Sequence, residues 1–179
     1  AATYANRVTS NGGLSIQNGS TIKLTGENDF KGDLVLDATS TVVADGDIYS
    51  HIGKGSLILN GDARAEFTLS DSSSGDWTWS KHVTGGGVLT LDRTSNAANG
   101  GELLLDAGSI SGFSGQLWLK NWGITLNTNG DANGMIAALT GSGAALTLGE
   151  GSDAEITGHV DLSNKVVTLA DGGRLVFTG

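Results

Sequence analysis

A seven-residue phrase occurs twice in this chain, because FKGDLVL at residues 30–36 returns as FSGQLWL at residues 113–119. Phe, Gly and both leucines keep their positions, whereas the residues between them change. Side chains two apart in a β-strand point to the same side, so the leucines of each phrase face one side and Val35 and Trp118 face the other. The repetition therefore predicts short strands with one constant apolar side and one variable side.

A second phrase, in which glycines precede two alternating leucines, extends this pattern along the chain. It reads GKGSLIL at 53–59, GGGVLTL at 85–91 and GSGAALTL at 141–148. Gly, Asn, Asp and Ser separate these runs, and no amphipathic helix of useful length interrupts them. The leucines of both phrases are expected in the interior: Leu34, Leu36, Leu57, Leu59, Leu89, Leu91, Leu117, Leu119, Leu146 and Leu148.

Glycine and proline usage agrees with stacked strands. The 179 residues include 29 glycines and no proline, so tight corners are frequent and no backbone N–H is lost to a sheet ladder. Each repeat can bury its apolar side only against the next repeat, which predicts an all-β solenoid, a parallel β-helix with about 20–25 residues per coil and roughly seven to nine coils. An antiparallel sandwich, which also uses many short strands, is the alternative.

The phrases TGENDFKGDLVLDA at 25–38, GKGSLILNG at 53–61 and GGGVLTLDR at 85–93 resemble the passenger-associated repeat of bacterial autotransporters. In that repeat a G-x-G-x-L-x-L strand alternates with an N-x-(aromatic)-x-G turn. The resemblance covers most of the chain and implies a right-handed parallel β-helix, exported across the outer membrane to the surface of a Gram-negative bacterium, with no catalytic residue. The sequence lacks the alternating ten-residue strands of a C-terminal membrane barrel, so residues 1–179 are expected to be a single segment of a longer passenger.

The charge balance restricts the classes of partner. Nineteen acidic and ten basic side chains give a formal net charge of −9, which disfavours nonspecific binding to nucleic acid and to anionic membranes. The absence of cysteine excludes disulfides and cysteine-ligated metals. No leader pattern and no apolar run of about 18 residues occurs in the sequence. We therefore expect no nucleic-acid partner, no membrane contact by this segment itself, and any export signal or anchor outside it.

Candidate catalytic groups do not form a specific constellation in the sequence. No G-x-S-x-G elbow marks a nucleophilic serine. Carboxylate pairs occur at Asp153 with Glu155 and at Asp45 with Asp47, and β-helix carbohydrate enzymes use acids on neighbouring coils. No basic partner or third acid lies at a fixed spacing from either pair, so solubilising surface charge is the favoured interpretation.

Metal and phosphate templates also fit poorly. Residues 129–134, NGDANG, match the opening of a calcium loop, but the twelfth position is Thr140 where a bidentate Glu is required. Residues 53–55, GKG, lack the full spacing of a phosphate-binding loop. We expect no catalytic residue, no cofactor and no metal site in this segment.

The tryptophans are the strongest candidates for binding residues. Trp118 lies between two inward leucines and is expected to point outward, and Trp122 follows it closely. Exposed tryptophan often marks contact with a partner or a sugar face; the alternative is burial beneath a loop or a neighbouring coil. Trp77 and Trp79 share one face of DWTWS and are expected in the core.

Together these features predict a noncatalytic, surface-exposed passenger segment of an autotransporter adhesin. Its candidate partners are the same passenger on other cells, in aggregation and biofilm formation, and a host-surface or glycan ligand. The alternative is a carbohydrate-active β-helix enzyme, a polysaccharide lyase or hydrolase, whose acids assemble only in the fold. A groove with three or more acids and a base would favour the enzyme, a flat polar ladder would favour adhesion, and a segment that assists passenger folding is a third alternative.

Overall fold

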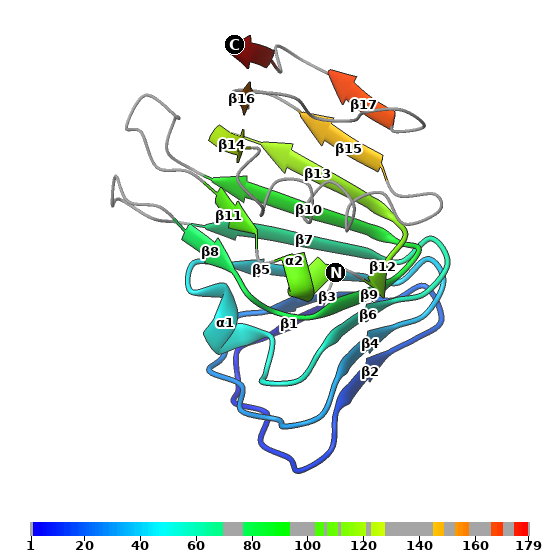
Figure 1. Cartoon of the computed structure of the whole chain (residues 1–179). Coiled ribbons are helices and arrows are strands. Elements are labelled where there is room, and N and C mark those ends of the chain that lie inside the picture. The colour runs from blue at the N-terminus through cyan, green and yellow to red at the C-terminus, as the bar shows by residue number, and fades with distance from the viewer. Residues whose placement is uncertain are drawn as a thin grey trace.

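The chain folds into a β-solenoid of stacked parallel strands (Figure 1). The structure is a computed structural model, and it describes residues 2–69, 77–93, 103–105, 107–110, 112–120, 123–127, 145–148, 153–157, 166–169 and 174–178. All 14 strand pairings among these residues are parallel, which confirms the solenoid and excludes the antiparallel sandwich. About four turns are described nearly in full.

Eight strands, one from each successive coil, form the largest sheet. In spatial order they are β1 (Ala2–Tyr4), β3 (Thr21–Leu24), β5 (Thr41–Asp45), β7 (Arg64–Leu69), β10 (Val88–Arg93), β13 (Gln116–Lys120), β15 (Ala145–Leu148) and β17 (Val166–Leu169). The register steps from Ala2 to Ile22, Val42 and Ala65, which are 20, 20 and 23 positions apart. These first coils therefore have the expected length.

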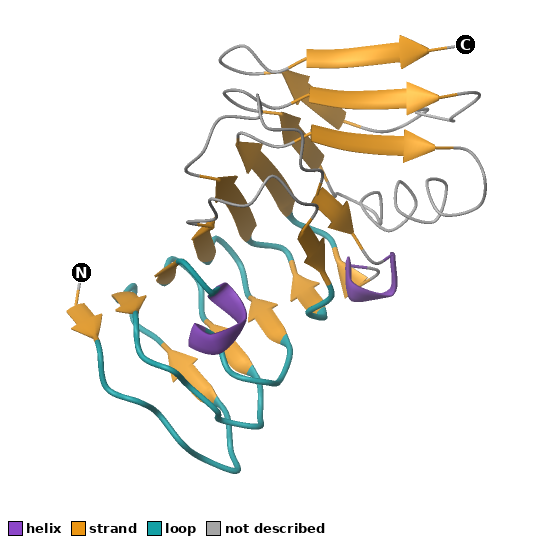
Figure 2. Ribbon diagram, turned by 90° about the vertical axis from the view of Figure 1, so that its left-hand side faces the viewer, coloured by secondary structure: helices purple, strands orange, loops and turns teal. Residues whose placement is uncertain are grey.

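Three smaller sheets and two short helices complete the coils. The five-stranded sheet contains β2 (Leu14–Ile16), β4 (Leu34–Leu36), β6 (Leu57–Leu59), β9 (Val83–Gly85) and β12 (Gly112–Phe113). The other two sheets contain β8 (Trp77–Trp79) with β11 (Leu103–Leu105), and β14 (Gly123–Asn127), β16 (Asp153–Thr157) and β18 (Arg174–Thr178). The helices are α1 (Ile48–His51) and α2 (Ala107–Ile110). Figure 2 shows strands of successive coils lying above one another.

The inner faces of the strands form one apolar core. Eight of the ten leucines expected inside are at most 1% exposed: Leu34, Leu36, Leu57, Leu59, Leu89, Leu91, Leu117 and Leu119. Leu146 and Leu148 have Leu117 and Leu119 as register partners, but their side chains lie outside the described residues. The alternation in the sequence therefore predicted the phase of these strands correctly, because only one face of each strand meets the core.

Of the two tryptophans of DWTWS, Trp79 lies in the core as expected, whereas Trp77 is only partly buried. Trp79 is fully buried and stacks on Phe67, with ring centroids 5.9 Å apart. Trp77 is half-buried, packs against the core and makes an edge contact with Trp79 at 5.8 Å. Tyr49 of α1 lies within 5.6 Å of the Trp77 ring and 5.9 Å of the Trp79 ring, centroid to centroid, so the helix is fixed to the next coil by aromatic contacts.

The two copies of the opening phrase lie in different sheets. FKGDLVL supplies β4 of the five-stranded sheet, whereas FSGQLWL supplies β13 of the eight-stranded sheet. Both places require an alternating strand with an apolar inner face, so the phrase specifies strand phase and not which wall of the solenoid it joins. A difference of sheet also explains why Leu57 and Leu89, which have the same place in the second phrase, are more than one coil length apart in the sequence. Leu57 belongs to the five-stranded sheet and Leu89 to the eight-stranded sheet, and the register partner of Leu57 in the next coil is Val83.

The turn that precedes β4 connects three coils through Asn28. Its side chain accepts a hydrogen bond from the Val8 amide at 2.7 Å and donates one to the His51 carbonyl at 2.6 Å. Phe30 is fully buried two residues later, and Gly53 of the next coil lies directly on its ring, where an added Cβ would be 2.3 Å from Cε2. Asn28 and Phe30 of the N-x-(aromatic) element therefore hold neighbouring coils together. Asn28 supplies hydrogen bonds to backbone groups of both adjacent coils, and Phe30 fills the core between them.

The adjacent glycines Gly86 and Gly87 should differ in their tolerance of a side chain, because only Gly87 lies against the backbone of the preceding coil. A Cβ on Gly87 would lie 2.3 Å from the Ala63 carbonyl oxygen, whereas a Cβ on Gly86 would lie no closer than 3.8 Å from Ser114 Oγ. We expect Gly87→Ala to lower the free energy of unfolding by about 2 kcal/mol or more, and Gly86→Ala to change it by at most about 0.5 kcal/mol. Urea denaturation measures both, and equal effects would contradict the stacking at this position.

Candidate functional site

The outward residues of the eight-stranded sheet form a continuous polar surface. Strand register places one such residue per coil in each of two rows, and none of those described is buried. We call this surface the outer sheet face, and it consists of Lys23, Val43, Glu66, Thr90 and Trp118 in one row and Asp45, Thr68, Asp92 and Lys120 in the other. Adjacent strands are about 4.8 Å apart, so the rows present side chains at regular spacing.

Trp118 lies on this face, as the alternation predicted. Its neighbours Leu117 and Leu119 are 1% and 0% exposed, whereas Trp118 itself is half-buried. The Lys120 ammonium lies 5.0 Å from the centroid of the indole ring, within the range of a cation–π contact. The indole Nε1 is buried and has no hydrogen-bond acceptor among the described residues. Trp122, the second expected binding residue, lies outside the described residues.

The outer sheet face carries charges of both signs. Lys23 and Asp45 form an ion pair between neighbouring coils. Glu66 of the same face is exposed on the following strand. These charges lie in strand register with threonines, so the outer sheet face is a regular ladder of polar side chains.

The fold places the two acidic pairs of the sequence in different elements, one at the end of β5 and the other in β16. Asp45 is paired with Lys23, while Asp47 comes directly before α1 and makes no side-chain hydrogen bond to that helix. Asp153 and Glu155 share one face of β16 by position, and register places Asp153 opposite Arg174, but their side chains lie outside the described residues. Within the described part of the chain, no group of three or more acidic or histidine side chains could hold a metal ion. The loop 129–134 is likewise outside it.

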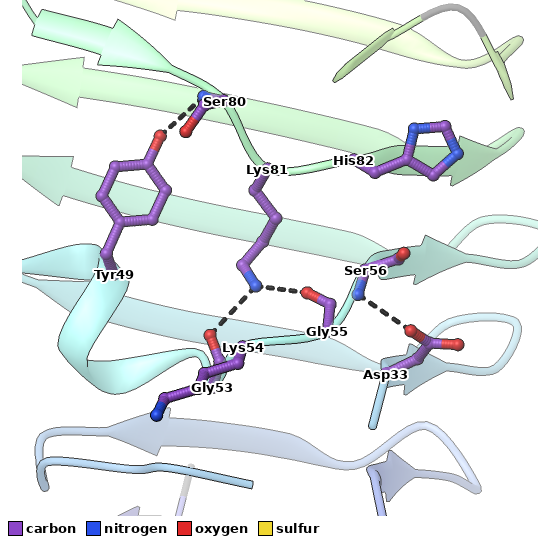
Figure 3. A pocket seen from close by; sticks show the side chains of 9 residues that line it. All are labelled: Asp33, Tyr49, Gly53, Lys54, Gly55, Ser56, Ser80, Lys81 and His82. Atoms are coloured by element: carbon purple, nitrogen blue, oxygen red, sulfur yellow. Dashed lines mark hydrogen bonds between the residues drawn. The ribbon is translucent and has the colours of Figure 1, made fainter. Parts of the chain in front are cut away.

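A pocket of about 430 Å³ lies where three successive coils enter the five-stranded sheet (Figure 3). Its lining residues are Asp33, Tyr49, Gly53, Lys54, Gly55, Ser56, Ser80, Lys81 and His82. Tyr49 closes one side, because its hydroxyl donates to the Thr78 carbonyl at 2.8 Å and accepts from the Ser80 amide at 2.8 Å. On the opposite side, Asp33 Oδ1 accepts from the Ser56 amide at 2.8 Å. The pocket is therefore held by hydrogen bonds from each of its coils.

Lys81 is the central group of this pocket. The residue is only 7% exposed, and its ammonium donates to the Gly53 carbonyl at 3.0 Å and to the Gly55 carbonyl. Burial lowers the pKa of Lys81 from its ordinary value of 10.5 to about 8, and the negative charge of Asp33 opposes that shift. Two carbonyl dipoles favour the charged form, so the ammonium persists at neutral pH although it is largely removed from water.

The sequence interpretation missed the role of Lys81, although a signal is present. Trp79, Lys81 and Val83 are two positions apart, and both apolar residues are fully buried. A lysine in phase with two core residues is unusual, because a buried charge needs partners. Gly53 and Gly55 of the GKG phrase supply those partners through their carbonyl oxygens.

Comparisons with known proteins do not assign this site. No protein-family model, no curated protein sequence and no solved structure matches the chain. Two features of the molecule itself bear on its function, the outer sheet face and the pocket around Lys81.

The lowered pKa of Lys81 predicts a specific pH dependence of stability. Between pH 8 and pH 10.5 the unfolded chain binds more protons at this lysine than the folded chain does, so its contribution to the free energy of unfolding rises with pH across that window. We therefore expect the free energy of unfolding of wild type minus that of Lys81→Met to become more positive from pH 8 to about pH 10. A difference that stays constant over this pH range would contradict the assignment.

Proposed function

We propose that this chain is a noncatalytic passenger segment of an autotransporter adhesin, displayed at the bacterial cell surface or released outside the cell. Its outward side chains support attachment to other cells or self-association with the same passenger. The observation that carries the proposal is the outer sheet face, a regular ladder of mixed charges and threonines that also contains Trp118. A solenoid suits this role because its walls repeat the same spacing from coil to coil.

The location of Trp118 on the outer sheet face, and not in the core, supports a role of this face in contact with a partner. A half-buried indole offers a large apolar area for a partner, and aromatic residues dominate the binding energy of many interfaces. The surrounding charges contribute specificity and association rate more than affinity. In the described residues, no helix has the length and apolar character needed to cross a membrane.

A carbohydrate-active enzyme is the second candidate, favoured by the pocket around Lys81. Among its lining residues Asp33 is the one carboxylate, whereas hydrolysis of a glycosidic bond ordinarily uses two. The described residues therefore provide a basic group and a single acid, which suits binding of a sugar better than its cleavage. Adhesion remains the first proposal for this reason.

We expect no turnover when the purified chain is incubated with a panel of neutral and acidic polysaccharides. Release of reducing ends detects hydrolysis, and ultraviolet absorbance of unsaturated products detects elimination. Reproducible turnover that is lost in Asp153→Asn or Glu155→Gln would establish the enzyme and overturn the noncatalytic proposal.

Trp118→Ala tests the proposed contact face. If Trp118 joins an interface, its removal should cost about 1–3 kcal/mol of binding without opening a cavity in the core. Bacteria that display the chain should then aggregate and attach less, while the purified variant keeps its melting temperature. Val35→Ala is the matched control, because Val35 has the same place in the repeated phrase but lies in the five-stranded sheet.

Unchanged attachment by the Trp118→Ala strain would reject the role of this residue. A large fall in melting temperature would show that the indole stabilises the fold instead. An equal loss of attachment in Val35→Ala would show that the effect does not belong to the outer sheet face.

A further inference from the structure

We propose that the pocket around Lys81 binds a sugar acid, with the ligand carboxylate on the Lys81 ammonium and its hydroxyl groups on the surrounding polar atoms. The ligand class is a single uronic acid residue or the exposed terminus of a chain that contains one. This site is separate from the outer sheet face, since none of its lining residues belongs to that face.

The geometry at Nζ points to an anionic ligand. An ammonium has three donors, and the described residues give it two acceptors, the carbonyl oxygens of Gly53 and Gly55. Figure 3 shows the Lys81 side chain extended across the pocket between Tyr49 and Ser56, with both of these bonds at its end. Because both acceptors are neutral, the buried positive charge lacks a contacting counterion within the described residues. A carboxylate at the third donor would supply both the hydrogen bond and the charge.

The other charges around the pocket favour a singly charged ligand that carries hydroxyl groups. Lys54 and His82 are exposed at the rim and add basic character, whereas Asp33 is an exposed acid on the same rim. Asp33 and the two glycine carbonyls would repel a compact dianion such as phosphate, but they can accept hydrogen bonds from sugar hydroxyls. The balance of acceptors and cations therefore selects a sugar carboxylate over a free phosphate.

The size and construction of the pocket agree with such a ligand. Its volume of about 430 Å³ lies within the range of small-molecule sites. The Tyr49 hydroxyl is held by two backbone partners in the following coil, so that wall is fixed before a ligand arrives. A preformed wall and a fixed cation lower the ordering cost of binding.

The test is titration of the isotope-labelled chain with D-glucuronate, followed by amide chemical shifts. In wild type we expect saturable shifts at residues 53–56 and 80–82, with half-saturation on the order of 1 mM. D-glucose, which lacks the carboxylate, and inorganic phosphate should each bind at least about tenfold more weakly. Binding should weaken as pH rises from 7 to about 10, because the Lys81 ammonium loses its proton in that range.

Two variants and one control assign the effect to Lys81. Lys81→Gln keeps a donor but removes the charge, and Lys81→Met removes both; each should weaken glucuronate binding by about tenfold or more. Lys31→Gln alters an exposed lysine outside the pocket and should leave binding within about twofold. Circular dichroism shows whether each variant folds, and the wild-type ligand series remains decisive if neither Lys81 variant does.

Absence of saturable shifts in wild type would overturn the proposal. Glucose or phosphate binding as tightly as glucuronate would overturn it as well, and so would retained glucuronate binding in a folded Lys81→Gln variant. Trp118→Ala should bind glucuronate normally, so failure of the pocket and failure of the outer sheet face can be told apart.

Discussion

Direct stacking of one coil's backbone on the next is the constraint on which the rest of this molecule depends. Parallel strands about 4.8 Å apart leave no room even for a Cβ at several positions where the backbones of two coils meet. Gly55 illustrates this, since an added Cβ would lie 2.3 Å from the Gly32 carbonyl oxygen. The glycine content and the absence of proline follow from that spacing, because each corner must turn sharply and each N–H must remain available to the neighbouring coil.

The same constraint explains how far the sequence predicted the fold. Alternating leucines fix which side of a strand faces the core, and that part of the prediction was correct at Leu34, Leu36, Leu117 and Leu119. The sequence pattern could not predict which sheet each strand joins, because β4 in the five-stranded sheet and β13 in the eight-stranded sheet require the same alternation of side chains. Which sheet a strand joins depends on the lengths of the turns that precede it, and these lengths vary from coil to coil.

The site was less predictable than the fold for a related reason. Trp118 could be placed outside from its two leucine neighbours, because strand phase is a local property. Lys81 owes its surroundings to carbonyl oxygens of the preceding coil, 26 and 28 positions earlier in the chain. Sequence spacing within one coil carries no information about that contact. The phase of Lys81 between Trp79 and Val83 indicates a buried lysine, but only the stacked structure shows what it meets.

A solenoid can acquire a pocket in one coil without losing its regular walls, because each coil contacts only its neighbours. Here α1 lies between β5 and β6, outside both of the larger sheets. Its Tyr49 reaches the following coil through Thr78 and Ser80, so the helix becomes a wall of the pocket. Lys81 stands two residues before Val83, the same offset at which Gly55 precedes Leu57. The helix α1, and a lysine at the place that Gly55 has in the preceding coil, therefore build a localised polar pocket, while the outer sheet face keeps its strand-by-strand repeat. The outer sheet face and the pocket around Lys81 can thus change independently on the same scaffold.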